Sequence, residues 1–373
     1  PAPGAGGCRL SAAQAGQRAP RRWRATMGIK QLSKLIADNT KGAIVEGELK
    51  KYFGWKIAVD ASTCLYQFLI AIRFAGETTL TDVEGNSTSH LSGMFYRTIR
   101  LCELGLRPAY VFDGKPPVMK SGELAKRSAR KREAQEALAT AKETGDDEEI
   151  ERHAKRSVRV TPEQTRDAKT LLRLMGVPVI DAPCEAEATC AELAKRKVVD
   201  AMASEDMDSL TFGAPLLLRN VTASEAKKEP VREFHLQRVL DGLGFTHAQF
   251  VDLCILLGCD YTDSIRGMGP VKALKYMREH GSIEAILAHI DRDKFGVPEP
   301  FPVDDVRRLF DAPDVIDASA VDLQWTEPDV DGLVEFLCGD RQFSEERVRR
   351  GAAKLAAAIK TKTQQRLTNY FGA

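Results

Sequence analysis

The sequence lacks the features of disulfide-stabilised, zinc-binding and membrane-spanning proteins. None of its eight cysteines forms a CxxC pair, and no cluster of histidine and cysteine has the spacing of a zinc site. No apolar run approaches the ~20 residues of a membrane-spanning helix, so no membrane association is expected. The net charge is only +1, so the total charge gives no evidence for a polyanionic partner. The six histidines are isolated along the chain, and we assign them no role.

The chain is long enough for a substantial hydrophobic core. Its 373 residues are 43% hydrophobic, which suits one large or two ordinary domains, and reduced thiols in an intracellular protein are expected. Residues 1–26 stand apart, since they hold five arginines and no acidic residue. They have no hydrophobic core of a secretory signal, so they form either a transit peptide or a disordered or translated upstream extension. We favour the extension, with the compact protein beginning at Met27.

Four short β-rich runs end in acidic residues. The runs KIAV, AYVF, GVPVI and VVDAMAS lead respectively to Asp60, to Asp113, to Glu185 with Glu187, and to Asp206 with Asp208, and a fifth acidic position is Asp260 in LLGCDY. Long helical stretches separate the runs, which predicts an α/β fold with a mostly parallel central sheet. The carboxyl ends of parallel strands border one crevice, so we expect these seven carboxylates to converge there.

Converging carboxylates repel one another unless cations hold them. A like-charge pair 4 Å apart costs about 4 kcal/mol at an effective dielectric near 20. Oxygen-only ligation without histidine suits Mg²⁺, with Mn²⁺ as a substitute, and the number of acids predicts two ions that assist an in-line phosphoryl displacement. Asp206 and Asp208 share a metal if their segment stays near-extended. Glu185 and Glu187 instead enter the first turn of a helix predicted to start at Pro183.

Two segments have the charge or turn chemistry of nucleic-acid contacts. Residues 120–132 hold six basic residues and one acid, and on a helix Lys120, Arg127 and Lys131 form one stripe that suits a phosphate, the alternative being a solvated helix face. Residues 133–151 then hold eight acids and one lysine, TGDD breaks the helix, and residues 152–159 are basic again. These charges predict two helices joined by an acidic tip.

The second segment is SIRGMGP. Gly267 and Gly269 permit a tight turn, and Pro270 starts a helix whose free amides accept a phosphate. The alternative is an ordinary helix–turn–helix corner.

Taken together, MGIKQLSKLI, VDAS, VFDGKPP, KSGELAKR, EAEA, SEDMDSLTFG, FVDLCILLGCDY and SIRGMGP resemble the eukaryotic flap endonucleases of the xeroderma pigmentosum group G family. The likeness runs from Met27 to Phe371. It implies a PIN-like nuclease core with a helical arch and a helix–turn–helix DNA-binding element. It also implies a structure-specific endonuclease that cuts 5′ flaps at single-strand/double-strand junctions by two-metal hydrolysis. The family adds 5′–3′ exonuclease activity and roles in Okazaki fragment maturation and long-patch base excision repair.

The resemblance also assigns roles to individual residues. The metal-binding acids fall at Asp60, Asp113, Glu185, Glu187, Asp206, Asp208 and Asp260, and the cations that face the scissile phosphate fall at Lys120 and Arg127. Further DNA contacts are expected at Tyr66, which stacks on a base, at Arg73 and Arg97, at Glu185, Gly258 and Asp260, and at Gly267 and Gly269, where K⁺ is often held by carbonyls. On periodicity alone, Tyr66 is a core residue.

The last residues read like a sliding-clamp binding box. Gln364, Leu367 and Tyr370 recur every three residues, as in a 3₁₀ turn, and Phe371 adds a second aromatic. The resemblance implies binding to proliferating cell nuclear antigen through residues 364–371; the alternative is a frayed amphipathic terminus. The lysine-rich tail usual in the family does not follow. A monomer in the nucleus (nucleolus and nucleoplasm) is expected, with the mitochondrion as the second location.

The expected organisation has six parts. They are the extension 1–26, an N-terminal nuclease region 27–133, the arch tip and second arch helix 134–159, an internal nuclease region with the helix–turn–helix 160–285, a helical region 286–360 packed on the core, and the tail 361–373. Because the family's N-terminal glycine lies near its active site, a protein beginning at Gly28 should cut faster than the full chain, and equal turnover by both would contradict this.

Three rival functions stay open. The first is another activity inside the family, either a 5′ exonuclease or a junction resolvase. The short arch and the clamp box argue against it. Outside the family, DMDSL mimics the start of a Mg²⁺ phosphohydrolase with an aspartyl nucleophile, although that motif belongs on the first strand. The third rival is a clamp-bound scaffold that holds DNA without cutting it.

Overall fold

A seven-stranded sheet forms the centre of the molecule. The computed structural model describes residues 28–73, 88–223 and 229–360. The strands are β1 (Ile44–Gly47), β2 (Lys56–Asp60), β3 (Arg107–Phe112), β4 (Val179–Asp181), β5 (Ala201–Ala203), β6 (Leu216–Arg219) and β7 (Val231–His235), in the order β1-β7-β6-β5-β2-β3-β4. The ladder from β6 through β5, β2 and β3 to β4 is parallel, and β7 pairs antiparallel with both of its neighbours, β6 and β1. The predicted α/β fold with a mostly parallel sheet is confirmed.

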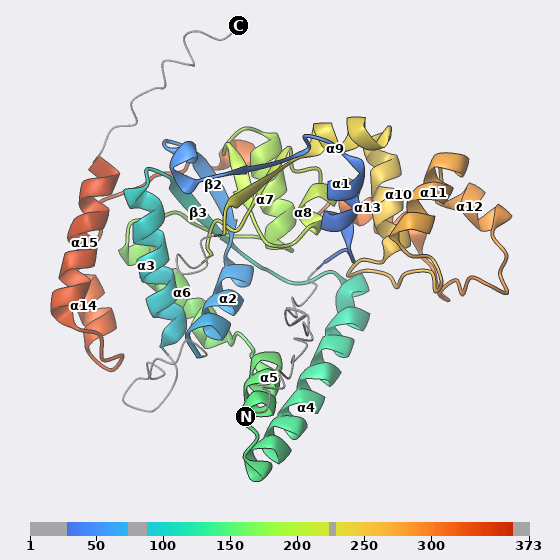
Figure 1. The fold of residues 1–373 in the computed structure, drawn as a ribbon. Helices are drawn as coiled ribbons and strands as arrows, with labels where there is room; N and C mark the ends of the chain where they lie inside the picture. The colour runs from blue at the N-terminus through green and yellow to red at the C-terminus, as the bar shows by residue number, and fades with distance from the viewer. Residues whose placement is uncertain (1–27, 74–87, 224–228, 361–373) are drawn as a thin grey trace, which may run out of the picture.

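Each face of the sheet is covered by its own helices and hydrophobic core. Residues alternate along β2, so Ala58 packs into one core while Ile57 and Val59 pack into the other. The first core joins α1 (Leu32–Asn39), α7 (Ala186–Lys195), α8 (Asp208–Thr211), α9 (Leu236–Leu243) and α10 (His247–Leu257). The second joins α2 (Ala61–Arg73), α3 (Ser89–Glu103), α6 (Pro162–Leu174), α14 (Val330–Cys338) and α15 (Glu345–Lys360). Figure 1 shows α3, α14 and α15 on one side of the sheet and α9 and α10 on the other.

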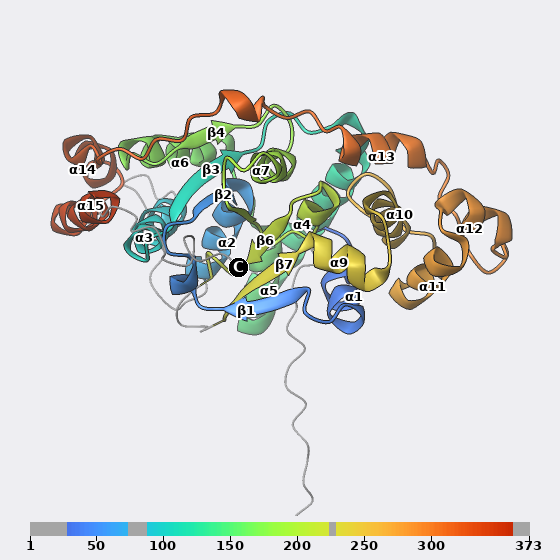
Figure 2. The ribbon, with the colours of Figure 1, turned by 90° about the horizontal axis from the view of Figure 1, so that it is seen from above.

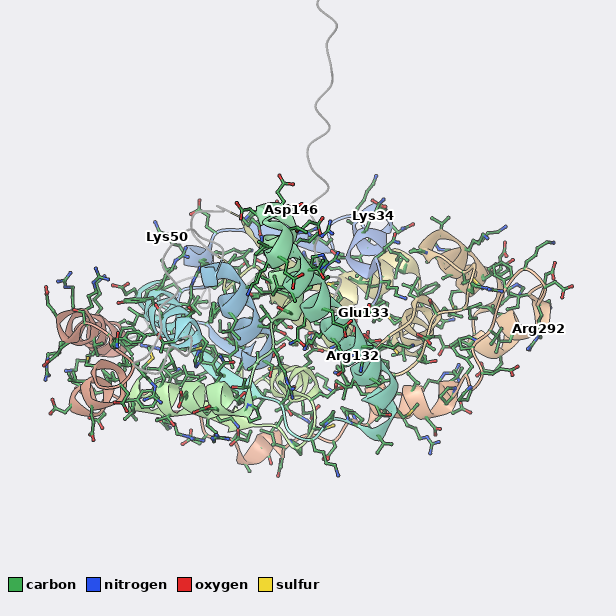
Figure 3. All side chains as sticks on the ribbon, turned by 90° about the horizontal axis from the view of Figure 1, so that it is seen from below. Lys34, Lys50, Arg132, Glu133, Asp146 and Arg292 are labelled. Carbon is green, nitrogen blue, oxygen red and sulfur yellow. The ribbon has the colours of Figure 1, made fainter. Side chains whose placement is uncertain are left out.

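A helical hairpin projects from the sheet. It consists of α4 (Ser121–Thr144) and α5 (Asp147–Ser157), and it hangs below the strands in Figure 1. Gly145 ends α4 with a left-handed φ of 72°, and the Asp146 carboxylate accepts a hydrogen bond of 3.1 Å from the Glu149 amide at the start of α5. Figure 3 shows α4 crossing the underside, with Arg132 and Glu133 midway and Asp146 at the tip. The two predicted helices are present, and the boundary expected at residue 133 falls inside the continuous α4.

Two helices, α11 (Pro270–His280) and α12 (Ile283–His289), extend the molecule beyond α10, at the far end from α14 and α15 in Figure 2. The next helix, α13 (Val303–Asp311), packs beside α10. The chain then returns along the β4 edge to α14, and the Trp325 indole on this path donates 2.8 Å to the Pro108 carbonyl of β3. Within the described ranges, no single helix is long and apolar enough to cross a membrane. The pair α9 and α10 meets that measure only when counted together across an 84° bend.

Candidate active site

The parallel strands deliver acidic side chains to one edge of the sheet. Asp60 is the last residue of β2, Asp113 follows β3, and the pair Glu185 and Glu187 opens α7 after β4. Asp206 and Asp208 follow β5, and Asp260 follows α10. The strands β2 and β3 pair directly, with Asp60 opposite Val111, so the first two strand ends lie close together.

The closest group consists of Glu187, Asp206 and Asp208, whose carboxylate oxygens lie within 4.8 Å of one another. The prediction of a shared metal requires an extended segment between Asp206 and Asp208. The segment is not extended. Met207 is helical, Asp208 begins α8, and the Asp208 amide donates 3.1 Å to the Asp206 carboxylate. The extended path that was the condition for a shared metal is absent, but this turn still places both carboxylates within 4.8 Å of Glu187 and of each other.

The segment before α1 lies directly on this group. The Ile29 amide donates 2.9 Å to the Asp208 carboxylate. Gly28 has a left-handed φ of 70°, and a Cβ atom at this position would lie 1.7 Å from the Asp206 Oδ1 atom. Only glycine fits here, because any side chain would occupy the space of the Asp206 carboxylate.

Burial and mutual repulsion make this crevice a demanding place for negative charge. The pKa of the Asp60 carboxyl is raised to about 6, by burial first and by Asp113 second. Burial likewise raises the pKa of Glu187, and the charges of Asp206, Asp60 and Asp208 raise it further. The pKa of Asp208 is raised by burial, Asp206 and Asp260, and that of Asp206 chiefly by burial. The ionised acids therefore favour a bound cation.

Two cations of the helical hairpin's base face the acids. Lys120, just before α4, pairs with Glu185 and lies 3.1 Å from the Asp260 carboxylate. The Arg127 guanidinium donates 2.6 Å to Asp260 and 3.1 Å to Glu123, one turn back on α4. Burial opposes the Lys120 charge, but the carboxylates of Glu185, Asp260 and Glu187 outweigh it and raise the pKa of the ammonium.

Glu185 and Glu187 diverge, as expected for neighbours at the start of a helix. Glu185 is the N-cap residue of α7 and Glu187 lies in its first turn. Glu187 joins the aspartates, whereas the two Glu185 oxygens accept from the Lys120 ammonium and from the Tyr261 hydroxyl. Sequence reasoning missed Tyr261, and its position directly after Asp260 was the available signal. Its ring packs edge-on against Phe310 of α13 at 5.2 Å, which holds the hydroxyl in place.

The donor set fits hard divalent cations. The ligand candidates are carboxylates that offer only oxygen atoms, as Mg²⁺ and Mn²⁺ prefer. Several of them are buried and depend on neighbouring positive charge to stay ionised. The residues placed to hold ions are Glu187, Asp206 and Asp208, with Asp60, Asp113, Glu185 and Asp260 around them.

The residues expected to contact DNA have mixed surroundings. Tyr66 on α2 is half-buried; burial raises the pKa of its hydroxyl, and the positive charge of Arg127 partly offsets that rise. Arg97 on α3 donates to the Ala223 carbonyl. Arg73 ends α2, and its side chain lies outside the described residues, as do residues 1–26 and the clamp-box residues Gln364, Leu367, Tyr370 and Phe371.

The glycines near α11 differ in what they permit. Gly258 has φ of 86°, and its missing Cβ makes room for the Ser264 backbone amide, which a Cβ would meet at 2.9 Å. Gly267 also has φ of 86° and forms the turn. Gly269 has φ of −88°, which any residue adopts, and a Cβ there would meet nothing within 4 Å. Gly267 alone is thus required by the turn, and Gly269 keeps the start of α11 open to an approaching group.

Comparisons with known proteins agree along most of the chain. The model of the XPG N-terminal domain matches residues 27–134, and that of the XPG I-region matches residues 176–260. Flap endonuclease 1 of Drosophila grimshawi is 58% identical over 92% of this chain and 89% of its own length. Flap endonuclease 1-B of Xenopus laevis is 57% identical over 92% and 90%.

Solved structures show the same similarity. The flap endonuclease-1 structure from Methanococcus jannaschii superposes with a TM-score of 0.68 at 31% identity, covering 88% of this chain and 99% of that one. The catalytic core of Rad2 in complex with DNA substrate gives 0.68 at 26% identity, covering 88% and 100%.

Proposed function

The chain belongs to the flap endonuclease group of the XPG family and is a structure-specific 5′ flap nuclease, and we propose that it hydrolyses the flap's phosphodiester bond with two Mg²⁺ ions in the acidic crevice. One observation carries this mechanism. Glu187, Asp206 and Asp208 present carboxylate oxygens within 4.8 Å of one another, and Lys120, just before α4, and Arg127 of α4 both pair with the Asp260 carboxylate. Mn²⁺ is the expected substitute, because it shares the preference for oxygen ligands.

Mg²⁺ bound here would supply the positive charge that an in-line displacement at phosphorus requires. The chain's own residues hold that charge in place. Glu187, Asp206 and Asp208 provide the innermost oxygens, and Asp60 is fixed by hydrogen bonds from the Thr63 amide at 3.1 Å and the Ser204 hydroxyl at 3.2 Å. A carboxylate fixed in this way needs little reorganisation when the substrate arrives.

Lys120 and Arg127 neutralise the scissile phosphate. Their nitrogens lie 3.1 and 2.6 Å from the Asp260 carboxylate. A phosphate entering between α4 and the acids meets these donors directly, and Arg127 offers a planar fork that matches two phosphate oxygens. The Glu123 carboxylate, 3.1 Å from the Arg127 Nε, orients that fork from the hairpin side.

The remaining parts of the substrate are placed by elements outside the crevice. The α4–α5 hairpin admits the single-stranded flap, Tyr66 stacks beside the cut, and Arg73 and Arg97 contact phosphates. The loop from Gly267 into α11 holds the duplex, since the first amides of a helix accept phosphate oxygens without reading sequence, and K⁺ bound to loop carbonyls would assist.

Cellular placement follows from the same family membership. We propose that a monomer acts in the nucleus, in Okazaki fragment maturation and long-patch base excision repair, with residues 364–371 binding the sliding clamp. The mitochondrion is the second location if residues 1–26 serve as a transit peptide. A pull-down of the clamp by the full chain, lost on Phe371→Ala, tests the clamp contact.

A cleavage assay separates the remaining functions. A duplex with a labelled 5′ flap is incubated with Mg²⁺ and the wild-type protein, with Asp206→Ala as the matched variant. Release of a labelled flap oligonucleotide by the wild type alone supports the proposal. An intact flap in both tubes supports the scaffold, and release of inorganic phosphate alone supports the phosphohydrolase. Faster cleavage of a four-way junction than of the flap indicates a resolvase, and exclusive release of mononucleotides indicates an exonuclease.

A further inference from the structure

A buried serine lies between two of the acidic strand ends. Ser204 directly follows β5, and only 6% of its surface is exposed. Strands β2 and β5 pair in parallel with Val59 opposite Ala203, so the residues that come next, Asp60 and Ser204, lie side by side. The acidic motifs alone do not point to this serine, because its surroundings depend on which strand lies next to β5.

The Ser204 hydroxyl contacts an acidic residue on each side. It donates 3.2 Å to the Asp60 Oδ2 atom and accepts 3.0 Å from the Asp206 amide. A serine hydroxyl has one proton to donate, and here that proton goes to the Asp60 carboxylate. The Asp206 Oδ1 atom in turn accepts 3.1 Å from the Asp208 amide. One hydroxyl therefore joins the acid at the end of β2 to the two acids that follow β5.

The other support of Asp60 is local. The Thr63 amide donates 3.1 Å to the Asp60 Oδ1 atom, and the Thr63 hydroxyl donates to Oδ2. Because Thr63 follows Asp60 by only three residues, these contacts fix Asp60 to the start of α2 and not to β5. Ser204 supplies the contact across the two strands. Its loss would also leave the buried Asp206 amide without a partner, which is costly for a backbone donor.

We propose that Ser204 is a positioning residue of the metal site, which holds the Asp60 carboxylate and the Asp206 backbone at a fixed separation before the cations bind. The inference rests on the proposed two-metal mechanism, since Asp60 and Asp206 are among the acids placed to hold the ions. Removal of a partner that orients a metal ligand typically lowers metal affinity or activity about 10- to 100-fold. Ser204 acts through these two acids, so binding of the flap should not depend on it.

A cavity beside Ser204 permits a conservative replacement. Cys64, Leu218 and Val221 line this cavity together with Ser204, and it has room for about one water molecule. Ser204→Thr keeps the hydroxyl and adds a methyl group, which the cavity can hold. Ser204→Ala removes the hydroxyl and both of its hydrogen bonds. The two variants therefore separate the effect of the hydroxyl from the effect of the size of the side chain.

The test is a titration of the DNA-free full chain with Mn²⁺ by isothermal calorimetry. The proteins compared are the wild type, Ser204→Ala, Ser204→Thr and Thr98→Val. Thr98→Val is the matched control because it also removes a buried hydroxyl, which lies on α3 and contacts the Tyr110 hydroxyl at 2.8 Å. We expect Ser204→Ala to bind Mn²⁺ at least about tenfold more weakly than the wild type, and the other two variants to stay within about twofold of it.

Cleavage of the flap gives a second readout. In Ser204→Ala, kcat at a fixed Mg²⁺ concentration should fall while KM for the flap stays unchanged, and Ser204→Thr should retain the wild-type kcat. Unchanged Mn²⁺ affinity in Ser204→Ala overturns the positioning role, as does equal weakening in Ser204→Thr or Thr98→Val. Absence of Mn²⁺ binding by the wild type would overturn the two-metal mechanism and this inference together.

Discussion

Lys126 of α4 donates to both carboxylate oxygens of Asp263, at 2.7 and 2.6 Å, and so joins the base of the helical hairpin to the loop that leads into α11. Neither residue belongs to the acidic crevice, but both neighbour residues that do, Arg127 and Asp260. The pair therefore connects the element that presents the cations to the element proposed to hold the duplex.

We predict that Lys126→Glu and Asp263→Lys each slow single-turnover cleavage of a saturating flap substrate. The loss should reach at most about fivefold, because exposed ion pairs contribute about 0–1 kcal/mol. The double exchange restores the pair and the net charge, so it should recover most of the rate. A double variant as slow as the slower single variant would show that the contact has no positioning role.

Tyr261 should act as a positioning residue for Glu185. Tyr261→Phe removes the hydroxyl that donates to the Glu185 carboxylate and leaves that oxygen without its partner. We expect kcat to fall roughly 10- to 150-fold, the equivalent of about 1.5–3 kcal/mol for a hydrogen bond to a charged group, while KM for the flap stays unchanged. Tyr276→Phe is the control. Steady-state kinetics with a shift in KM alone would assign Tyr261 to substrate binding instead.

Gly28 provides a test of the crevice's geometry. In Gly28→Ala the new methyl group would overlap the Asp206 carboxylate, so we expect kcat to fall about 100-fold, the effect of roughly 1 Å of misplacement. Gly42→Ala is a matched control, because Gly42 has a similar φ of 76° but a Cβ there meets nothing within 4 Å. It should lose stability and keep its kcat. Equal kcat values for the two variants would show that overlap with the Asp206 carboxylate does not cause the loss.

The buried acids should weaken the metal-free protein as pH rises. The pKa of Asp60 is raised to about 6 and that of Asp208 is also raised, so the folded state binds more protons than the unfolded state between about pH 4 and 7. The contribution of these acids to the free energy of unfolding is complete below the pKa that they have in the unfolded chain. It is lost as the pH rises through their pKa in the folded protein.

In EDTA, the melting temperature of the wild type should thus decline from pH 5 to pH 8. Asp208→Asn should reduce that decline and melt several degrees higher at pH 8, for a gain of about 1–3 kcal/mol. Asp181→Asn is the control, since Asp181 also ends a strand but is 59% exposed. Saturating Mg²⁺ should raise the melting temperature of the wild type at pH 8 to at least that of Asp208→Asn. A lower melting temperature for Asp208→Asn in EDTA at pH 8 would contradict the prediction.

The outer helices depend on one buried charge pair. Arg307 of α13 donates to both oxygens of Asp252 on α10 at 2.7 Å, and the Asp252 side chain is only 6% exposed. Arg307→Ala leaves this carboxylate buried without its partner, which should cost about 3–5 kcal/mol in urea unfolding. Arg308→Ala, at a side chain 76% exposed, should cost less than about 0.5 kcal/mol. Similar losses of unfolding free energy in both variants would mean that the buried Arg307–Asp252 pair does not cause the loss in Arg307→Ala.

The sequence predicted the residues that depend on strand direction. Asp60 and Asp113 could be placed because a parallel sheet brings strand ends to one edge, whatever the details of each loop. The arrangement of Asp206 and Asp208 could not, since a single helical residue, Met207, decides whether they follow an extended or a turned path. The break after α4 was predictable because it depends on two adjacent residues alone: Gly145 ends α4 and Asp146 caps α5.

Contacts between distant segments were beyond the sequence. Tyr261 reaches Glu185 across 76 positions, and its place directly after Asp260 gives a signal for proximity to the acids but not for the residue that its hydroxyl contacts. His280 and His289 lie on successive helices, and only the angle between those helices brings the rings together. Such contacts depend on packing, which neither periodicity nor spacing encodes.

The α4–α5 hairpin has almost no interior. Of the 24 residues of α4, only Ala134 and Ala141 are buried, and alanine loses little contact with solvent when it is covered. The hairpin can therefore open and close with little change in the stability of the sheet beneath it. Its amides should exchange with deuterium far sooner than those of β2 and β3, and if the hairpin admits the flap as proposed, a strand can leave it without unfolding of the sheet.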